Sequence, residues 1–221
     1  MKSGCLTLIS LHADPAMAPG MGEGGGTHSY VRELMLGLSK RNWSLTVLTR
    51  WADTRLLERE RLSSKIKIIR LRIGELAPMD KRGLNDLHLT SLAEARSALA
   101  AEPAMNLLHS VYWNSGRVAM DLSDELGIPF VHTVISNGWR RWQQGARDQP
   151  AERLEVERRV FASAFAVFCV SGQERSDLIE HYAVDPNKVV VVGRPVAYSF
   201  LHPCRDELGR PTRPDWREAG S

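Results

Sequence analysis

The stretch LISLHADPAMAPGMGEGGGTHSYVRELMLGLSKRNWSLTVLTRW, from Leu8 to Trp51, joins two short apolar runs through a glycine-rich loop and an amphipathic segment. In residues 27–42 the apolar side chains recur every three or four positions, which is typical of a helix that buries one face. The apolar runs at 5–11 and 44–51 are bounded by turn residues, as buried strands are. The stretch therefore predicts the order strand, loop, helix, strand.

The rest of the chain continues this alternation. Further strands are predicted at 64–73, which alternates as an edge strand does, and at 105–113, 129–135, 164–171 and 188–193. Helical patterns lie between or before them at 84–102, 117–127, 151–163 and 172–183. Strands and helices that alternate at this spacing predict an α/β fold with a doubly wound, mainly parallel, Rossmann-like sheet.

Composition limits the domain organisation and the partners. We expect residues 1–203 to form one domain and the polar, proline-bearing residues 204–221 to form a linker or tail. The 29 basic and 26 acidic residues leave a net charge of +3, too balanced to indicate nucleic acid or an anionic membrane as partner. No apolar run reaches the roughly 20 residues of a transmembrane helix.

The three cysteines lie far apart and without metal-ligand spacing, which predicts a reducing, cytoplasmic location and no metal site. Lys2 before the apolar run, with Ala-Met-Ala at 16–18, resembles a secretory signal. The polar side chains Thr7 and Ser10 within that run favour a buried strand instead.

Five glycines fall within residues 20–26, and several interpretations are open for them. Gly20, Gly22 and Gly25 spell a dinucleotide fingerprint, with Asp53 as its ribose-binding acid, but the segment between strand and helix is too long for that motif. A P-loop would need Gly-Lys-Ser/Thr after the glycines, and this is absent from the sequence. Two interpretations remain. The segment is a surface loop without a ligand, or it is a loop whose amides face an anion beside the helix terminus.

Three segments carry a family resemblance: GEGGGTHSYVRELMLGLSKRNWSLTVLTRW at 22–51, LLHSVYWNSGRVAMDLSDELGIPFVHT at 107–133 and RLEVERRVFASAFAVFCVSGQERSDLI at 153–179. In this order they resemble the N-terminal, acceptor-side domain of family 4 retaining glycosyltransferases of the GT-B fold. The branch most similar contains the mycothiol inositol-phosphate glycosyltransferase and sucrose-phosphate synthase. The resemblance extends from about Leu6 to Pro203.

The resemblance implies a set of site residues and no cofactor. Its glycine loop, Gly24, Gly25 and Gly26, would approach the donor diphosphate, where backbone donors favour the developing charge of the leaving group. The acceptor, a small hydroxyl compound bearing a phosphate, would contact the side chains of His28, Lys81, Tyr112, Ser136 and Arg153. Other interpretations of these residues are a solvated Lys81, a packing Tyr112 and an Arg153 paired with Glu157 along the helix.

Departures from the family pattern limit what it implies. Ile135 stands where the family has a histidine at the reaction centre, and an isoleucine side chain forms no hydrogen bond. His132 is retained as a candidate catalytic residue, although it lies on a strand where core histidines are common. His28 replaces an amide residue usual in the inositol-phosphate enzymes.

The family's second domain, which holds the nucleotide-sugar donor, is absent from this sequence. We therefore expect either a truncated enzyme or one subunit of a split enzyme, with a separate donor-domain chain as partner. Two alternatives are a nicotinamide-dependent oxidoreductase and a non-catalytic binding module, the latter with an exposed apolar face near the C-terminal tail.

Overall fold

The computed structural model describes residues 4–17, 26–77, 79, 81–146 and 152–194, with the backbone alone at 81–82, 204–205 and 211–212. One sheet holds eight strands: β1 Cys5–Ile9, β2 Ser44–Arg50, β3 Arg59–Arg61, β4 Ile66–Leu71, β5 Leu107–Val111, β6 Phe130–Thr133, β7 Ala166–Cys169 and β8 Val189–Val191. Their order is β3-β4-β2-β1-β5-β6-β7-β8, and every pair is parallel except β3 with β4. The predicted doubly wound, mainly parallel sheet is confirmed.

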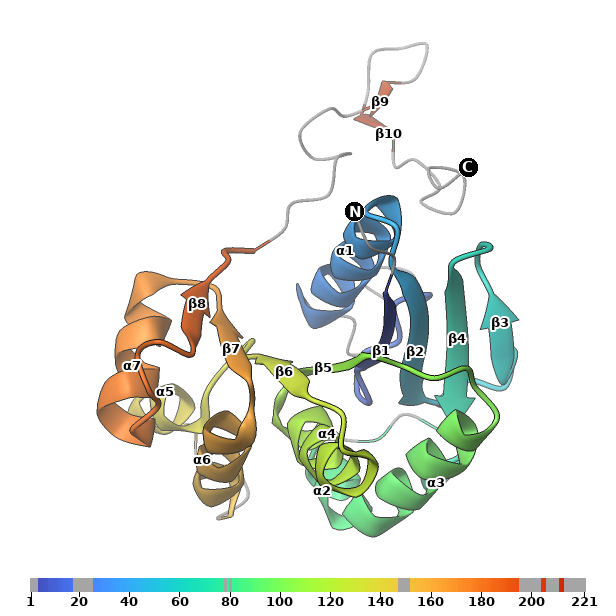
Figure 1. Ribbon diagram of the computed structural model, residues 1–221. Coiled ribbons are helices and arrows are strands. Elements are labelled where there is room, and N and C mark those ends of the chain that lie inside the picture. The colour runs from blue at the N-terminus through green and yellow to red at the C-terminus, as the bar shows by residue number, and fades with distance from the viewer. Residues whose placement is uncertain are drawn as a thin grey trace.

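The helices lie on both faces of this sheet (Figure 1). They are α1 Gly26–Lys40, α2 Lys81–Asp86, α3 His88–Ala100, α4 Trp113–Leu126, α5 Gly138–Gln143, α6 Arg153–Ser163 and α7 Gly172–Tyr182. Side chains of α1 pack on one face in a cluster with Leu8, Val47 and Ile68, whereas α3, α4, α6 and α7 contribute to the larger cluster on the other face. No helix in the described part of the chain is long and apolar enough to cross a membrane.

The structure corrects two local predictions and adds elements that were not predicted. The expected edge strand at 64–73 is β4, an interior strand, because the short strand β3 pairs antiparallel along its outer side. The helix expected at 84–102 is divided into α2 and α3, and α5 was not predicted. Beyond β8, the backbone at Cys204–Arg205 (β9) pairs antiparallel with Pro211–Thr212 (β10). The tertiary pairing of β3 overrides its fully charged sequence Arg-Glu-Arg, which carries no apolar pattern.

The sheet changes winding direction between β1 and β5. From β1 the chain crosses through α1 to β2 on one side, and from β5 it crosses through α4 to β6 on the other. In open α/β sheets the crevice beyond the carboxyl ends of two such strands binds ligands. The loops that follow β1 and β5 therefore mark the place to look for a site.

Close packing between α4 and β6 leads to a first prediction. A Cβ atom on Gly116 would lie 2.8 Å from both His132 Cε1 and Val160 Cγ1. We expect Gly116→Ala to lower the free energy of unfolding by about 1–2 kcal/mol, because overpacking outweighs the gain in helix propensity of about 1 kcal/mol. Urea denaturation measures the change.

Gly172→Ala is the matched control. Gly172, like Gly116, lies in the first turn of a helix, but no atom lies within 4 Å of its Cβ position. Its stability should stay within about 0.5 kcal/mol of the wild type. Equal stability of the Gly116→Ala variant would contradict the close contact.

Candidate functional site

The loops after β1, β5 and β6 meet at the switch point of the sheet. Tyr112 directly follows β5, and its ring centroid lies 4.3 Å from that of His12 in the loop after β1. Ser115 Oγ accepts a hydrogen bond from the Leu11 amide at 3.0 Å, which joins the loop after β1 to the first turn of α4. Ser136 lies in the loop after β6. The fold thus brings three separate segments of the chain together at one edge.

Arg153, the first residue of α6, lies between the loops after β5 and β6. Its side chain is 1% exposed, and its guanidinium carbon lies 5.2 Å from the ring centroid of Tyr112. Nη2 donates to the Ser136 carbonyl at 2.8 Å and to Ser136 Oγ at 3.4 Å, and Nη1 donates to Tyr112 Oη at 3.4 Å. Three of the predicted acceptor residues, Tyr112, Ser136 and Arg153, are therefore direct neighbours.

Glu157 fixes the position of this arginine. Arg153 Nε donates to Glu157 Oε1 at 2.8 Å, and both side chains are 1% exposed, so the pair is buried rather than on the helix surface. Glu157 Oε2 accepts from the Gly138 amide at 2.8 Å and from Tyr182 Oη at 2.5 Å. Burial and the neighbouring carboxylate raise the pKa of Tyr182, which keeps its hydroxyl protonated as a donor. The carboxylate therefore connects α5, α6 and α7.

The backbone of Tyr112 adopts φ 73° and ψ 152°, a conformation that side-chain-bearing residues rarely take. It persists because the Tyr112 amide donates to the Thr133 carbonyl at 3.2 Å and the Tyr112 carbonyl accepts from the Gly116 amide at 2.9 Å. Strain of about 1–3 kcal/mol of this kind concentrates at functional positions. Here it places the phenol ring between His12 and Arg153.

A further cation, Arg194, stands beside the first residue of α1. A Cβ atom on Gly26 would lie 3.3 Å from Arg194 Nη1, and Arg194 Nη2 lies 3.5 Å from the carbonyl oxygen of Ile135. Burial raises the pKa of the Glu174 carboxyl, and the charge of Arg194 opposes that rise. No carboxylate of the described residues lies within ion-pair distance of this guanidinium. The sequence analysis missed Arg194, although a basic residue directly after the last strand was an available signal.

His132 lies in the core beneath this edge. It is 1% exposed, and its Nδ1 lies 2.8 Å from Ser110 Oγ. Burial, with a smaller contribution from His109, lowers the pKa of His132 to about 3. Burial also lowers the pKa of His109 to about 4, and its Nε2 lies 2.8 Å from Thr133 Oγ1. Both imidazoles are therefore neutral at pH 7, and the surroundings of His132 are those of a packed core histidine.

The remaining predicted residues divide into two groups. Gly24, Gly25 and the side chain of Lys81 lie outside the described residues. Gly26 begins α1, His28 is buried in the first turn of that helix, and Ile135 is half-buried after β6. Asp53, considered above as a ribose-binding acid, pairs instead with Arg55 at 2.7 Å, and the hydrogen bonds from Arg55 lower the pKa of Asp53 to about 2.

Fold and site together define an α/β domain of the Rossmann-like class, with polar groups at the carboxyl edge of its sheet. Comparison with known families gives the family. Residues 25–195 match the model of the glycosyl transferase 4-like domain, so the chain belongs to that family. The resemblance of the sequence to the N-terminal half of a GT-B glycosyltransferase is thereby confirmed.

Individual relatives agree with this assignment. The D-inositol 3-phosphate glycosyltransferase of Frankia alni is 30% identical over 203 residues, covering 87% of this chain and 49% of the relative. The corresponding protein of Acidothermus cellulolyticus is 28% identical over 219 residues. The solved sucrose-phosphate synthase of Thermosynechococcus elongatus superposes with a TM-score of 0.83 at 25% identity, over 91% of this chain and 50% of that one. The chain thus spans about half the length of these relatives.

The buried ion pair leads to a second prediction. Glu157→Gln leaves the Arg153 guanidinium without its carboxylate in a site of low dielectric constant. We expect the free energy of unfolding to fall by about 3 kcal/mol, since breaking a buried pair costs about 3–5 kcal/mol and the amide retains one acceptor. Thermal and urea denaturation measure it.

Glu155→Gln on the same helix is the control, because the pair of Glu155 with Arg158 is 3.6 Å long and both side chains are more than half exposed. We expect a change below about 0.5 kcal/mol for this exposed pair. If the two variants lose equal stability, Glu157 does not hold Arg153 in place.

The buried histidines lead to a third prediction, on pH. Their pKa values of about 4 for His109 and about 3 for His132 lie below the unfolded value of about 6.5. The unfolded chain therefore binds more protons between pH 6.5 and 4, so stability falls as the pH is lowered through this window. Each histidine should contribute a slope of about 1.4 kcal/mol per pH unit there.

Urea denaturation at pH 7, 6 and 5 measures the slope. The variant His109→Gln should remove the contribution of His109 to the pH dependence of the free energy of unfolding. The slope should therefore decrease by about 1.4 kcal/mol per pH unit between pH 6 and 5. An unchanged slope would show that His109 is already protonated in the folded protein.

Proposed function

We propose that this chain is the acceptor-binding half of a retaining glycosyltransferase, which transfers a sugar from a nucleotide sugar to a hydroxyl of a phosphate-bearing polyol or sugar. The observation that carries this proposal is the cluster of Tyr112, Ser136 and Arg153 at the switch point of the sheet. The Arg153 guanidinium is buried and already donates to Ser136 and Tyr112, so we propose that it positions these two groups and supplies positive charge beside an anionic oxygen. The Ser136 and Tyr112 hydroxyls add the uncharged contacts that a polyol needs.

The donor side of the proposed cleft begins at α1. Gly26 opens this helix, and the Arg194 guanidinium lies against it. A diphosphate leaving group gains negative charge as the glycosidic bond breaks, and fixed donors aimed at that charge favour the transition state. We assign this role to the amides of the loop at 24–26 together with Arg194.

Transfer requires that donor and acceptor meet in reacting geometry, and this chain supplies one side of that arrangement. We propose that a donor-binding domain, in this polypeptide or in a separate chain, supplies the other. His132 is proposed to position the β6 edge through Ser110 rather than to touch the substrate, because it is buried. Ile135 borders the cleft as an apolar residue, and its carbonyl accepts from Arg194.

The acceptor is proposed to be related to inositol 3-phosphate, the compound in the names of the relatives. The sucrose-phosphate synthase neighbour also carries a phosphate in its name. His28 stands where the inositol-phosphate enzymes have an amide residue, so we propose a phosphate-bearing acceptor as the class and D-inositol 3-phosphate as the first compound to test.

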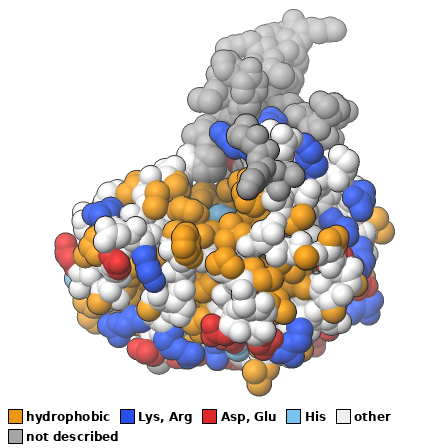
Figure 2. All heavy atoms as spheres, in the orientation of Figure 1, with side chains coloured by type: hydrophobic (Ala, Val, Ile, Leu, Met, Phe, Trp, Pro, Cys, Tyr) orange, Lys and Arg blue, Asp and Glu red, His pale blue; other side chains and the backbone are white. Residues whose placement is uncertain are grey.

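A non-catalytic binding module is the second candidate function, and exposed apolar residues favour it. Val190, Val191 and Val192, at and after the edge strand β8, are 42%, 45% and 50% exposed, and Phe165 before β7 is 74% exposed. Figure 2 shows hydrophobic side chains gathered over the middle of the face seen in Figure 1, beside α1. Such a surface suits a protein partner whether or not the assembly transfers sugar.

A calorimetric titration of the full chain with D-inositol 3-phosphate tests the proposed acceptor site. We expect Ser136→Ala to weaken binding about three- to tenfold, the equivalent of one hydrogen bond to the ligand. Ser163→Ala, an exposed serine at the end of α6, should bind as the wild type does. Unphosphorylated inositol should bind at least tenfold more weakly.

Equal binding of both compounds would contradict the phosphate-bearing acceptor and leave the family assignment intact. A second measurement addresses the proposed donor domain: residues 1–221 tested alone should show no multiple-turnover sugar transfer from a nucleotide sugar. Sustained transfer by the chain alone would overturn the proposal that it needs a donor domain.

A further inference from the structure

A row of polar side chains crosses the sheet at its amino end, on the face covered by α3. The register aligns four residues from four neighbouring strands: Thr7, Thr46, Lys67 and Arg61. Two residues further along the strands, the same face is apolar and buried, with Ile9, Leu48 and Ile69 in the main core. The polar row therefore departs from the pattern of a sheet face that is filled by a helix.

A cavity of about 240 Å³ lies over this row. The helix on this face, α3, ends at Ala100. The loop that follows forms the opposite wall with Glu102, Pro103 and Met105, and Cys5 also lines the space. The volume exceeds that of a few water molecules and admits a small organic ion.

The charges around this cavity are unbalanced. Arg61, Lys65 and Lys67 line it, whereas Glu102 is the one carboxylate among its lining residues. Glu102 is already shared, because its carboxylate accepts from Lys67 at 2.6 Å and from Arg59 at 3.2 Å. Lys65 Nζ donates to the uncharged Asn42 Oδ1 at 2.7 Å. A net positive charge thus faces the cavity.

Two of the polar side chains that line the cavity have no hydrogen-bond or ion-pair partner among the described residues. The Thr46 hydroxyl and the exposed Arg61 guanidinium form no hydrogen bond or ion pair with another described side chain. Thr7 Oγ1 donates at 3.3 Å to Met105 Sδ, a weak acceptor. An anion that also carries hydroxyl groups would supply hydrogen-bond and ion-pair partners for these side chains.

We propose that this cavity is a second binding site, for a phosphate monoester of a small polyol. The phosphate would pair with Arg61 and Lys65, which supply charge-assisted hydrogen bonds. The polyol hydroxyls would bond to Thr46 and to the Glu102 carboxylate, and the carbon chain would lie along Pro103 and Met105. The volume suits a compound the size of glycerol 3-phosphate.

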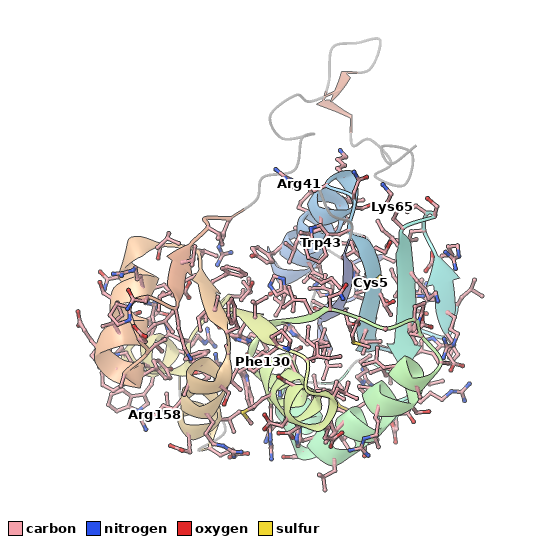
Figure 3. All side chains as sticks on the ribbon, viewed as in Figure 1. Cys5, Arg41, Trp43, Lys65, Phe130 and Arg158 are labelled. Carbon is pink, nitrogen blue, oxygen red and sulfur yellow. The ribbon has the colours of Figure 1, made fainter. Side chains whose placement is uncertain are left out.

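This site is separate from the proposed acceptor site. It lies at the amino ends of β1, β2 and β4, whereas Tyr112, Ser136 and Arg153 lie at or beyond the carboxyl ends of β5 and β6. Figure 3 shows Arg41 and Lys65 at the end of the sheet where β2 and β4 begin. The inference therefore does not depend on the proposed function.

Calorimetric titration of the full chain with glycerol 3-phosphate tests the site, with glycerol and inorganic phosphate as comparison probes. Glycerol 3-phosphate should bind more tightly than inorganic phosphate, and glycerol should show no binding. Arg61→Gln should weaken the binding of glycerol 3-phosphate at least fivefold, and Thr46→Val should weaken it about threefold. Arg41→Gln is the matched control: an exposed arginine at the same edge that does not line the cavity, with an unchanged affinity expected.

Cys5 provides a second readout that locates the ligand. Cys169 is buried, so in a Cys204→Ser background Cys5 is the thiol open to alkylation. Saturating glycerol 3-phosphate should slow alkylation of Cys5 at least threefold, and Arg61→Gln should abolish this protection. Binding without protection of Cys5, equal weakening by Arg61→Gln and Arg41→Gln, or no binding of glycerol 3-phosphate would each overturn the proposal.

Discussion

The buried ion pair between Arg153 and Glu157 is the interaction on which the geometry of the carboxyl edge depends. Both side chains are 1% exposed, and burial of the pair is compensated because each charge faces the other and further polar atoms of both side chains are hydrogen-bonded. Glu157 holds α5 and α7, and Arg153 holds the loops after β5 and β6. One pair therefore joins α5, α6, α7 and the loops after β5 and β6.

The side chains at this edge of the sheet differ in how firmly they are held. The side chains of Tyr112, Ser136 and Arg153 are held by buried contacts, and the strained backbone of Tyr112 is maintained by the same surroundings. Next to α1, Arg194 is exposed and borders Gly26 without a carboxylate partner among the described residues. The chain spans about half the length of its glycosyltransferase relatives.

Much of the architecture was predictable because local patterns agree with it. The run at Cys5–Ile9 and the stripe in Gly26–Lys40 carry the periods of a buried strand and an amphipathic helix, and both elements formed as expected. Prediction failed for β3 and for the boundary between α2 and α3. The sequence of β3 has no strand pattern, and its pairing with β4 comes from contacts along the edge of the sheet.

The sequence by itself determined the alternation of strands and helices and the family, because apolar periodicity and motif order are local properties of the chain. Only the tertiary structure decided which polar residues become neighbours. Tyr112, Ser136 and Arg153 lie on three segments that meet through the order of parallel strands. It also decided that Glu157 and His132 are buried, since burial depends on elements packed from distant parts of the chain.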